Sequence, residues 1–273
     1  MADNEPIIRL EGVHKAFNSH VVLDGVDLAI QPGKTTVVIG PSGCGKSVLL
    51  KHIVALLRPD RGRVFFREHE VSSMPERMLV KVRRRIGFLF QGGALFDSMT
   101  VEQNICFPLV EHSVGTPDEQ KRRCAEVLSM MGMDGLQHRY PEELSGGQKK
   151  RIALARAIAL NPEVILYDEP TTGLDPIRAD LINELIVRLQ EALGTTAIVV
   201  THDMTSARKV GDRIIMLHEG HFIADATPEA LDRIDNDVVC HFVQGKASRQ
   251  ELDELRHGRF QEMAETSGSD QGN

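Results

Sequence analysis

The sequence contains no tryptophan, two tyrosines and only four cysteines among its 273 residues. The cysteines (Cys44, Cys106, Cys124 and Cys240) form neither a CxxC pair nor a zinc spacing with histidine, which indicates a reducing, cytosolic compartment. No apolar run reaches the ~18–20 residues that a membrane-spanning helix needs. The N-terminal stretch MADNEPIIRL also lacks the charged-then-apolar pattern of a signal peptide. If the protein acts at a membrane, we expect another chain to bring it there.

An excess of basic residues is also missing, since the formal net charge is −7. Domains that bind nucleic acid normally carry a strong basic excess, so we expect no nucleic-acid partner. Hydrophobic residues make up 41% and charged residues 26% of the chain, which is typical of a globular protein. A single large domain is compatible with this length.

Short apolar runs alternate with helical patterns along the chain. Strands are expected over residues 7–17, 21–30, 35–39, 86–91, 163–168 and 196–200. Several short helical signals without a good strand predict a helical lobe over about residues 92–147. The alternation predicts an α/β fold with a parallel sheet. The polar stretch 247–273 is predicted to be a disordered tail.

A Gly-rich segment follows the third expected strand and matches G-x-x-x-x-G-K-[ST] in full. It comprises Gly40, Pro41, Ser42, Gly43, Cys44, Gly45, Lys46 and Ser47. Its glycines let backbone N–H groups turn toward phosphate oxygens, and the next helix directs its positive end at them. Lys46 is expected to reach the β- and γ-phosphates and Ser47 to hold Mg²⁺. Cys44 either only fills a variable position of the motif or has its thiol pKa lowered by nearby amides and Lys46.

A second strand, residues 163–168, delivers two neighbouring carboxylates at its end. Asp168 is expected to act on Mg²⁺ through its water shell, and Glu169 to orient or deprotonate the attacking water. His202 follows another strand and is a candidate contact for the γ-phosphate or the water. Gln91 ends a strand of its own. A single His or Gln is a weak signal, so a purely structural role stays open for both.

The segment Leu144-Ser145-Gly146-Gly147-Gln148 precedes an apolar helix expected from Lys149 to Leu160. Ser145 and the two glycines would form a second helix N-terminus that faces phosphate. One nucleotide needs only one such phosphate-binding helix N-terminus. We therefore expect the second to serve ATP held by another copy of the chain.

Taken in order, these motifs resemble the ABC ATPase family over about residues 7–245. The matching positions are Phe17, the phosphate loop, Gln91, LSGGQ at 144–148, Asp168-Glu169, the loop Thr172-Gly173-Leu174-Asp175 and His202. The resemblance implies a P-loop NTPase core with an antiparallel β lobe and a helical lobe. It also implies a homodimer that encloses two ATP molecules and hydrolyses them.

The resemblance assigns roles to single positions. Phe17 would stack on adenine, although aromatic residues also pack well inside sheets. Ser145, Gly146, Gly147 and Gln148 would contact the partner's ATP, with Asp175 in the dimer-contact loop. Ser47, Gln91 and Asp168 would hold Mg²⁺. Lys46, Gln91, Glu169 and His202 would act in hydrolysis.

Two further segments resemble the ATPase subunits of the Mla/Mce lipid-transport group. They are Gln91-Gly92-Gly93-Ala94-Leu95-Phe96 and Pro108-Leu109-Val110-Glu111-His112. In this family the region receives the coupling helix of the membrane subunit. Gly92 and the stretch Arg67-Glu68-His69-Glu70 depart from the group's usual residues. The alternative is that the apolar Ala-Leu-Phe is not specific to this group and can occur here in any importer or exporter ATPase.

The Mla/Mce resemblance implies an integral membrane permease of the MlaE type, an Mce-domain lipid-binding protein and phospholipid as cargo. Some relatives also bind a STAS-domain subunit. The chain would then lie on the cytoplasmic face of the inner membrane. Two alternatives stay open, an importer ATPase for another small substrate and a non-transport ABC ATPase such as one for iron–sulfur cluster assembly. A metal site at His218 and His221 is not expected, because Glu219-Gly220 between them indicates a hairpin turn.

Overall fold

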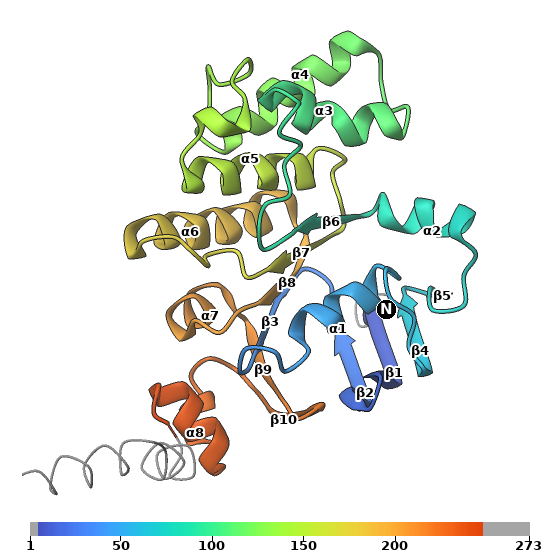
Figure 1. Cartoon of the computed structure of the whole chain (residues 1–273), viewed down its shortest axis with the longest axis vertical. Coiled ribbons are helices and arrows are strands. Elements are labelled where there is room, and N and C mark those ends of the chain that lie inside the picture. Colours follow the sequence, from blue (N-terminus) through green and yellow to red (C-terminus); the bar gives the residue numbers. More distant parts are fainter. Residues whose placement is uncertain (1–4, 248–273) are drawn as a thin grey trace, which may run out of the picture. The chain divides into compact units, whose positions relative to one another are not determined.

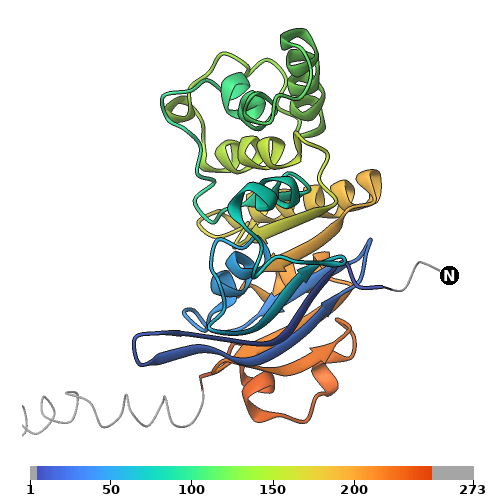
Figure 2. The ribbon, with the colours of Figure 1, turned by 90° about the vertical axis from the view of Figure 1, so that its right-hand side faces the viewer.

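The computed structural model describes residues 5–247 in two compact units, residues 5–231 and residues 232–247. The larger unit holds both sheets and the helices from α1 to α7 (Figures 1 and 2). The smaller unit holds the helix α8 (Asp237–Gln244), capped by the Asn236 side chain at its start and by Gly245 at its end. A 3₁₀ turn, η2 (Leu231–Arg233), lies where the two units meet in the sequence.

A six-stranded sheet in the order β10-β9-β3-β8-β7-β6 forms the centre of the larger unit (Figure 1). Its strands are β3 (Thr35–Ile39), β6 (Ile86–Leu89), β7 (Val164–Asp168), β8 (Thr196–Val200), β9 (Arg213–His218) and β10 (His221–Ala226). All neighbours are parallel except β10, which returns antiparallel to β9. Every residue of β3, β7 and β8 is buried. Their continuous apolar runs are therefore explained by cover on both faces.

A second, antiparallel sheet has the order β2-β1-β4-β5. Its strands are β1 (Ile8–Phe17), β2 (His20–Ile30), β4 (Arg61–Phe66) and β5 (His69–Glu70). The helix α1 (Lys46–Ile53) contributes Leu49, Leu50 and Ile53 to one apolar core shared by both sheets. The predicted α/β fold with an antiparallel β lobe is confirmed.

Two helices lie on the face of the six-stranded sheet opposite α1 (Figure 1). They are α6 (Pro176–Leu193) and α7 (Met204–Val210). The Asp175 side chain caps α6 by accepting a hydrogen bond from the Arg178 backbone N–H at 3.0 Å. Gly194 ends α6 with a φ of 61°, a left-handed conformation that favours glycine. Asp175 before Pro176 is a typical helix start, and Gly194 is a typical helix end.

The predicted helical lobe contains α3 (Val101–Glu111), α4 (Pro117–Met130), the 3₁₀ turn η1 (Pro141–Glu143) and α5 (Gly146–Ile158). The helix α5 contacts both α3 and α4, and α2 (Glu76–Arg83) leads from the β lobe into β6. The sequence prediction that α5 begins at Lys149 is wrong by three residues. Ser145 is the N-cap, and its hydroxyl accepts the backbone N–H of Gln148, so the two glycines form the first turn.

The strand expected over residues 86–91 is shorter in the structure, since β6 ends at Leu89. The hairpin at Glu219-Gly220 is confirmed, with φ values of 46° and 81°. Within residues 5–247, none of the helices is both long enough and apolar enough to cross a bilayer. The tail predicted over 247–273 lies outside the described residues except for residue 247.

Candidate functional site

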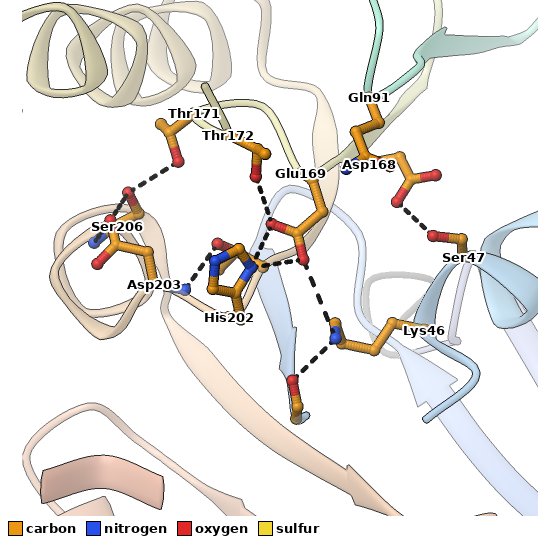
Figure 3. A network of polar contacts seen from close by, with 12 residues as sticks. Lys46, Ser47, Gln91, Asp168, Glu169, Thr171, Thr172, His202, Asp203 and Ser206 are labelled. Atoms are coloured by element: carbon orange, nitrogen blue, oxygen red, sulfur yellow. Dashed lines mark hydrogen bonds and ion pairs between the residues drawn. The ribbon is translucent and has the colours of Figure 1, made fainter. Parts of the chain in front are cut away.

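The predicted site residues meet at one edge of the six-stranded sheet. The strands β3, β8, β7 and β6 are neighbours and run parallel, so their carboxyl ends open on the same edge. The phosphate loop follows β3, His202 follows β8, Asp168 ends β7 and Gln91 follows β6. This edge is where open α/β sheets bind ligands. Figure 3 shows these side chains converging there from separate strands.

The phosphate loop requires glycine at two places where it lies close to other backbone. A Cβ on Gly40 would come within 2.2 Å of the Leu217 carbonyl oxygen, and one on Gly45 within 2.6 Å of the Val22 side chain. Gly40 and Gly45 also have φ values of 150° and 105°. The tight course of the loop therefore cannot be kept with larger residues at these positions.

Lys46, the first residue of α1, directs its ammonium group back across the loop. Its Nζ donates to the carbonyl oxygens of Gly40 at 2.8 Å and Pro41 at 2.9 Å, and only 6% of the residue is exposed. The same Nζ lies 4.0 Å from the Glu169 carboxylate (Figure 3). A buried cation with neutral acceptors is suited to exchange them for phosphate oxygens, since charge-assisted hydrogen bonds are stronger.

Ser47 and Asp168 form a direct pair in which the Ser47 hydroxyl donates to the carboxylate at 2.7 Å. Burial raises the pKa of Asp168, and the hydrogen bond from Ser47 works against this rise. Gln91 lies on the same side of the site (Figure 3). Hydroxyl, carboxylate and amide oxygens are the hard ligands that Mg²⁺ prefers, so this donor set fits the ion predicted from the sequence.

Glu169 directs its carboxylate into the middle of the site. Thr172 Oγ1 donates to it at 3.0 Å, and His202 Nδ1 lies 2.9 Å from it. Glu169 is 8% exposed, whereas the His202 side chain is 51% exposed. The buried carboxylate is thus oriented by two side chains and accompanied by the Lys46 ammonium. Such an arrangement can hold and polarise a water molecule.

Phe17 is not part of a strand core, which was the alternative to a role in binding. It is the last residue of β1, is 42% exposed, and its ring centroid lies 5.4 Å from Lys15 Nζ. An exposed ring beside a cation at a strand end is available for stacking on a planar ligand.

The signature residues Ser145, Gly146, Gly147 and Gln148 lie apart from the phosphate loop of their own chain. Among residues 5–247, no hydrogen bond or ion pair joins the two segments. The Gln148 side chain instead accepts the Ser145 backbone N–H at 2.8 Å, which completes a capping box. This placement agrees with the expectation that the segment serves another copy. Asp175 is likewise occupied with capping α6.

Cys44 differs from the expectation in one respect, because burial raises the pKa of its thiol and outweighs the opposing influence of Lys46. The sequence suggested a lowered pKa from Lys46 and nearby amides alone. The side chain is partly exposed, and its Sγ would lie 2.9 Å from a Cβ on Gly40. Because Cys44 lies within the phosphate loop, a group added to its thiol would occupy space expected for the nucleotide.

Alkylation of Cys44 is therefore expected to be slow at neutral pH and to block ATP binding once it has occurred. The rate of N-ethylmaleimide labelling, followed by peptide mass spectrometry, should still be rising above pH 9, because the thiolate is the reactive form. Bound ATP should protect the site, while Cys240 in the same sample serves as the comparison. Full ATP binding by chain confirmed to carry the label at Cys44 would contradict this expectation.

Two polar residues of the helical lobe were not recognised as buried from the sequence, where Lys150 was expected on the exposed face of its helix and no role was predicted for Asn104. Asn104 is fully buried, and its side-chain amide donates to the carbonyl oxygens of Phe96 and Met99, while its oxygen accepts the Phe96 N–H at 2.8 Å. Lys150 is also buried and reaches the backbone of Gln91 and Glu169. A polar residue on the apolar face of a helix is the signal that could have revealed both.

The phosphate loop, the paired acids and the parallel sheet define the class of P-loop ATPases with an α/β core. Within that class, the ABC transporter family model matches residues 23–172. The chain belongs to this family, and it is the ATP-binding, ATP-hydrolysing subunit of an ABC transporter.

Relatives that are named for the transport of different substrates resemble the chain to a similar degree. It is 38% identical over 245 residues to the intermembrane phospholipid transport ATP-binding protein MlaF of Haemophilus influenzae, covering 89% of this chain and 92% of that protein. It is 40% identical over 257 residues to the sulfate/thiosulfate import ATP-binding protein CysA of Pseudomonas putida, covering 93% and 76%. A probable ribonucleotide transport ATP-binding protein, mkl of Mycobacterium tuberculosis, is 38% identical, covering 88% and 67%.

Among solved structures, the dimeric post-hydrolysis state of the cassette MJ0796 bound to ADP and Pi aligns with a TM-score of 0.76. It is 35% identical and covers 81% of this chain and 98% of that one. The structure of cbiO1 from Clostridium perfringens, part of the ABC transporter complex cbiONQ, aligns with a TM-score of 0.77 at 29% identity and covers 93% of this chain and 99% of that one.

Proposed function

We propose that the chain works as a head-to-tail homodimer with two ATP molecules at its interface. Each ATP would lie between the phosphate loop of one copy and Ser145, Gly146 and Gly147 of the other. The support is the separation of these two segments within one chain, together with the dimeric cassette that it resembles. ATP would favour the closed dimer because it makes contacts there that the open state lacks.

In this proposal the residues at the sheet edge divide the work of hydrolysis. Lys46 binds the β- and γ-phosphates, and Phe17 stacks on adenine. Ser47, Asp168 and Gln91 would hold Mg²⁺, which neutralises phosphate charge when it is bound. Glu169 orients the attacking water and accepts its proton, while His202 keeps the Glu169 carboxylate in place through the 2.9 Å contact.

Replacing Ser145 by arginine should stop hydrolysis without weakening nucleotide binding by the monomer, since Ser145 acts on the partner's ATP. The trans arrangement predicts complementation. A mixture of Ser145→Arg and Lys46→Ala chains forms heterodimers with one intact composite site, and ATPase activity should exceed that of either variant alone. A chain carrying both changes, mixed with the unmodified chain, forms heterodimers with no intact site. Equal activity of the two kinds of heterodimer would contradict action in trans.

We also propose that the chain drives phospholipid transport as the ATPase of an Mla/Mce-type transporter. The observation that carries this is an aromatic groove of about 410 Å³ to which both segments that resemble this group contribute lining residues. Phe96 of the first segment and Phe107, directly before the second, meet there with ring centroids 4.7 Å apart, and Phe88 stacks on Phe90 with ring centroids 4.1 Å apart. The groove would receive the coupling helix of an MlaE-type permease.

The MlaF relative supports this assignment, since the match covers nearly all of both chains. Phospholipid would move in support of outer-membrane lipid asymmetry, with an Mce-domain protein and, in some systems, a STAS-domain subunit as further partners. The chain would then lie at the cytoplasmic face of the inner membrane, held there by the permease. The CysA relative favours a second candidate, an importer ATPase for a small anion.

Affinity purification of the full chain from mildly solubilised membranes tests the assignment. Co-purification of an MlaE-type permease, an Mce-domain protein and bound phospholipid, identified by mass spectrometry, is the expected result. The matched control is the same chain with Phe96→Asp, which should fold and bind ATP but lose the permease. Recovery of a different permease would discard the lipid assignment and keep the ATPase. Recovery of soluble iron–sulfur assembly proteins alone would overturn the transporter assignment.

A further inference from the structure

Lys150 is a buried cation on α5 that none of the family motifs explains. It is 7% exposed, and its Nζ donates to the backbone carbonyl oxygen of Gln91 and, at 3.3 Å, to that of Glu169. These acceptors belong to two loops that follow different strands, β6 and β7. One ammonium group therefore joins the signature helix to both loops of the hydrolytic site.

Burial of a lysine without a paired carboxylate side chain is costly, and burial lowers the pKa of Lys150, while the nearby charges of Asp168 and Glu169 favour its protonated form. An uncharged residue of similar size would avoid this cost. The ammonium has three donors, and carbonyl oxygens are good acceptors for it. The free-energy cost of burying the Lys150 ammonium group is explained if the two carbonyl groups must be held in fixed positions.

Glu169 has a backbone that needs such support. Its φ is 49°, in the left-handed region that non-glycine residues rarely adopt, and it precedes Pro170, which restricts it further. Its N–H donates to Val200 O at 2.9 Å, and Lys150 binds its carbonyl oxygen on the other side. Residues strained in this way persist at functional sites only where the surroundings hold them.

The same helix also holds the residues after Gln91. Arg156 donates to the carbonyl oxygens of Gly93 and Ala94, both at 2.8 Å, and Ala94 has a φ of 48°. Lys150 and Arg156 thus bind three carbonyl groups of the segment 91–94 from one helix, and that helix begins at Ser145. Movement of the signature segment would be transmitted through Lys150 to Gln91 and Glu169 together.

We propose that Lys150 is a positioning residue for ATP hydrolysis, which holds Gln91 and the Glu169 backbone in fixed register with the signature helix. Lys150 donates only to backbone carbonyl groups, so it acts on the reaction through Glu169 and Gln91. The rate of the chemical step should depend on Lys150, while the affinity for ATP should not. This inference concerns the ATPase step and does not depend on which cargo is moved.

The test compares Lys150→Met with Lys150→Arg in the full chain, with Lys149→Met as the matched control. Lys149 is on the same helix and its side chain makes no hydrogen bond or ion pair among residues 5–247. Lys150→Met should lower kcat about 10- to 100-fold, as outer partners of active-site groups commonly do, with KM for ATP unchanged. Lys150→Arg keeps a charged donor and should recover a large part of kcat. Lys149→Met should leave both constants unchanged.

Thermal unfolding of each variant separates positioning from stability. If Lys150→Met does not fold, the comparison of Lys150→Arg with Lys150→Gln decides, since glutamine is too short to reach both carbonyl oxygens. Unchanged kcat in a folded variant would overturn the proposal. A rise in KM with kcat intact would do the same, because it would place Lys150 in nucleotide binding. Equal losses in Lys150→Arg and Lys150→Met would also overturn it, because a charged donor at this position would then not restore the rate.

Discussion

A chain carrying Glu169→Gln binds ATP and fails to turn it over; this is the largest effect on rate that we expect. Glutamine has the shape of glutamate and can still accept from Thr172, which lies 3.0 Å from the carboxylate. It cannot take a proton from the attacking water, and it removes the negative charge beside Lys46. Loss of one preorganised transition-state contact commonly costs ~10²–10³ in rate, so steady-state ATPase activity should fall by about that factor.

The affinity of Glu169→Gln for ATP should be equal to or higher than that of the unmodified chain, because a buried negative charge near the phosphates is gone. Because bound ATP is not hydrolysed, the closed dimer should accumulate. Size-exclusion chromatography with light scattering would detect it. The control is Glu184→Gln, which removes a carboxylate from an exposed pair with Arg188 on α6 and should change neither property. Normal turnover by Glu169→Gln would disprove the assigned role.

The parts of the site that are determined by residues close together in the sequence could be predicted from the sequence. The phosphate loop, the strand before it and the helix after it are each dictated by residue type, because only glycine fits where Gly40 and Gly45 lie against other backbone. The same holds for the helix that begins at Asp175 and Pro176, where a side-chain cap and a fixed φ both specify the start. These features depend on neighbours in the sequence.

The contacts of Lys150 and the burial of Cys44 could not be read in this way, because they depend on residues far away in the chain. Lys150 meets Gln91 and Glu169 only once three elements have packed together. The sequence could show the charges near Cys44 but not the burial that raises its thiol pKa. Phe17 could have packed in a strand core or projected from a strand end, and only the fold distinguishes the two.

The second large effect is expected at Lys46, where alanine should abolish tight ATP binding. Lys46 is buried, so its ammonium is not strongly screened, and truncating one partner of a buried, hydrogen-bonded charge pair costs ~2–5 kcal/mol. That range corresponds to a loss in affinity of about 30-fold or more. Removal of the cation also leaves Glu169 facing the phosphates without the ammonium group that lies 4.0 Å from its carboxylate.

Equilibrium titration with a fluorescent ATP analogue in the presence of Mg²⁺ measures the loss, and thermal unfolding confirms that Lys46→Ala is folded. The matched control is Lys34→Ala, because Lys34 forms an exposed pair with Asp212 outside the site. Binding of ATP by folded Lys46→Ala with unchanged affinity would place the phosphates elsewhere. The roles proposed for Ser47, Glu169 and the partner's Ser145 would then also be wrong, since each role depends on phosphates bound at Lys46.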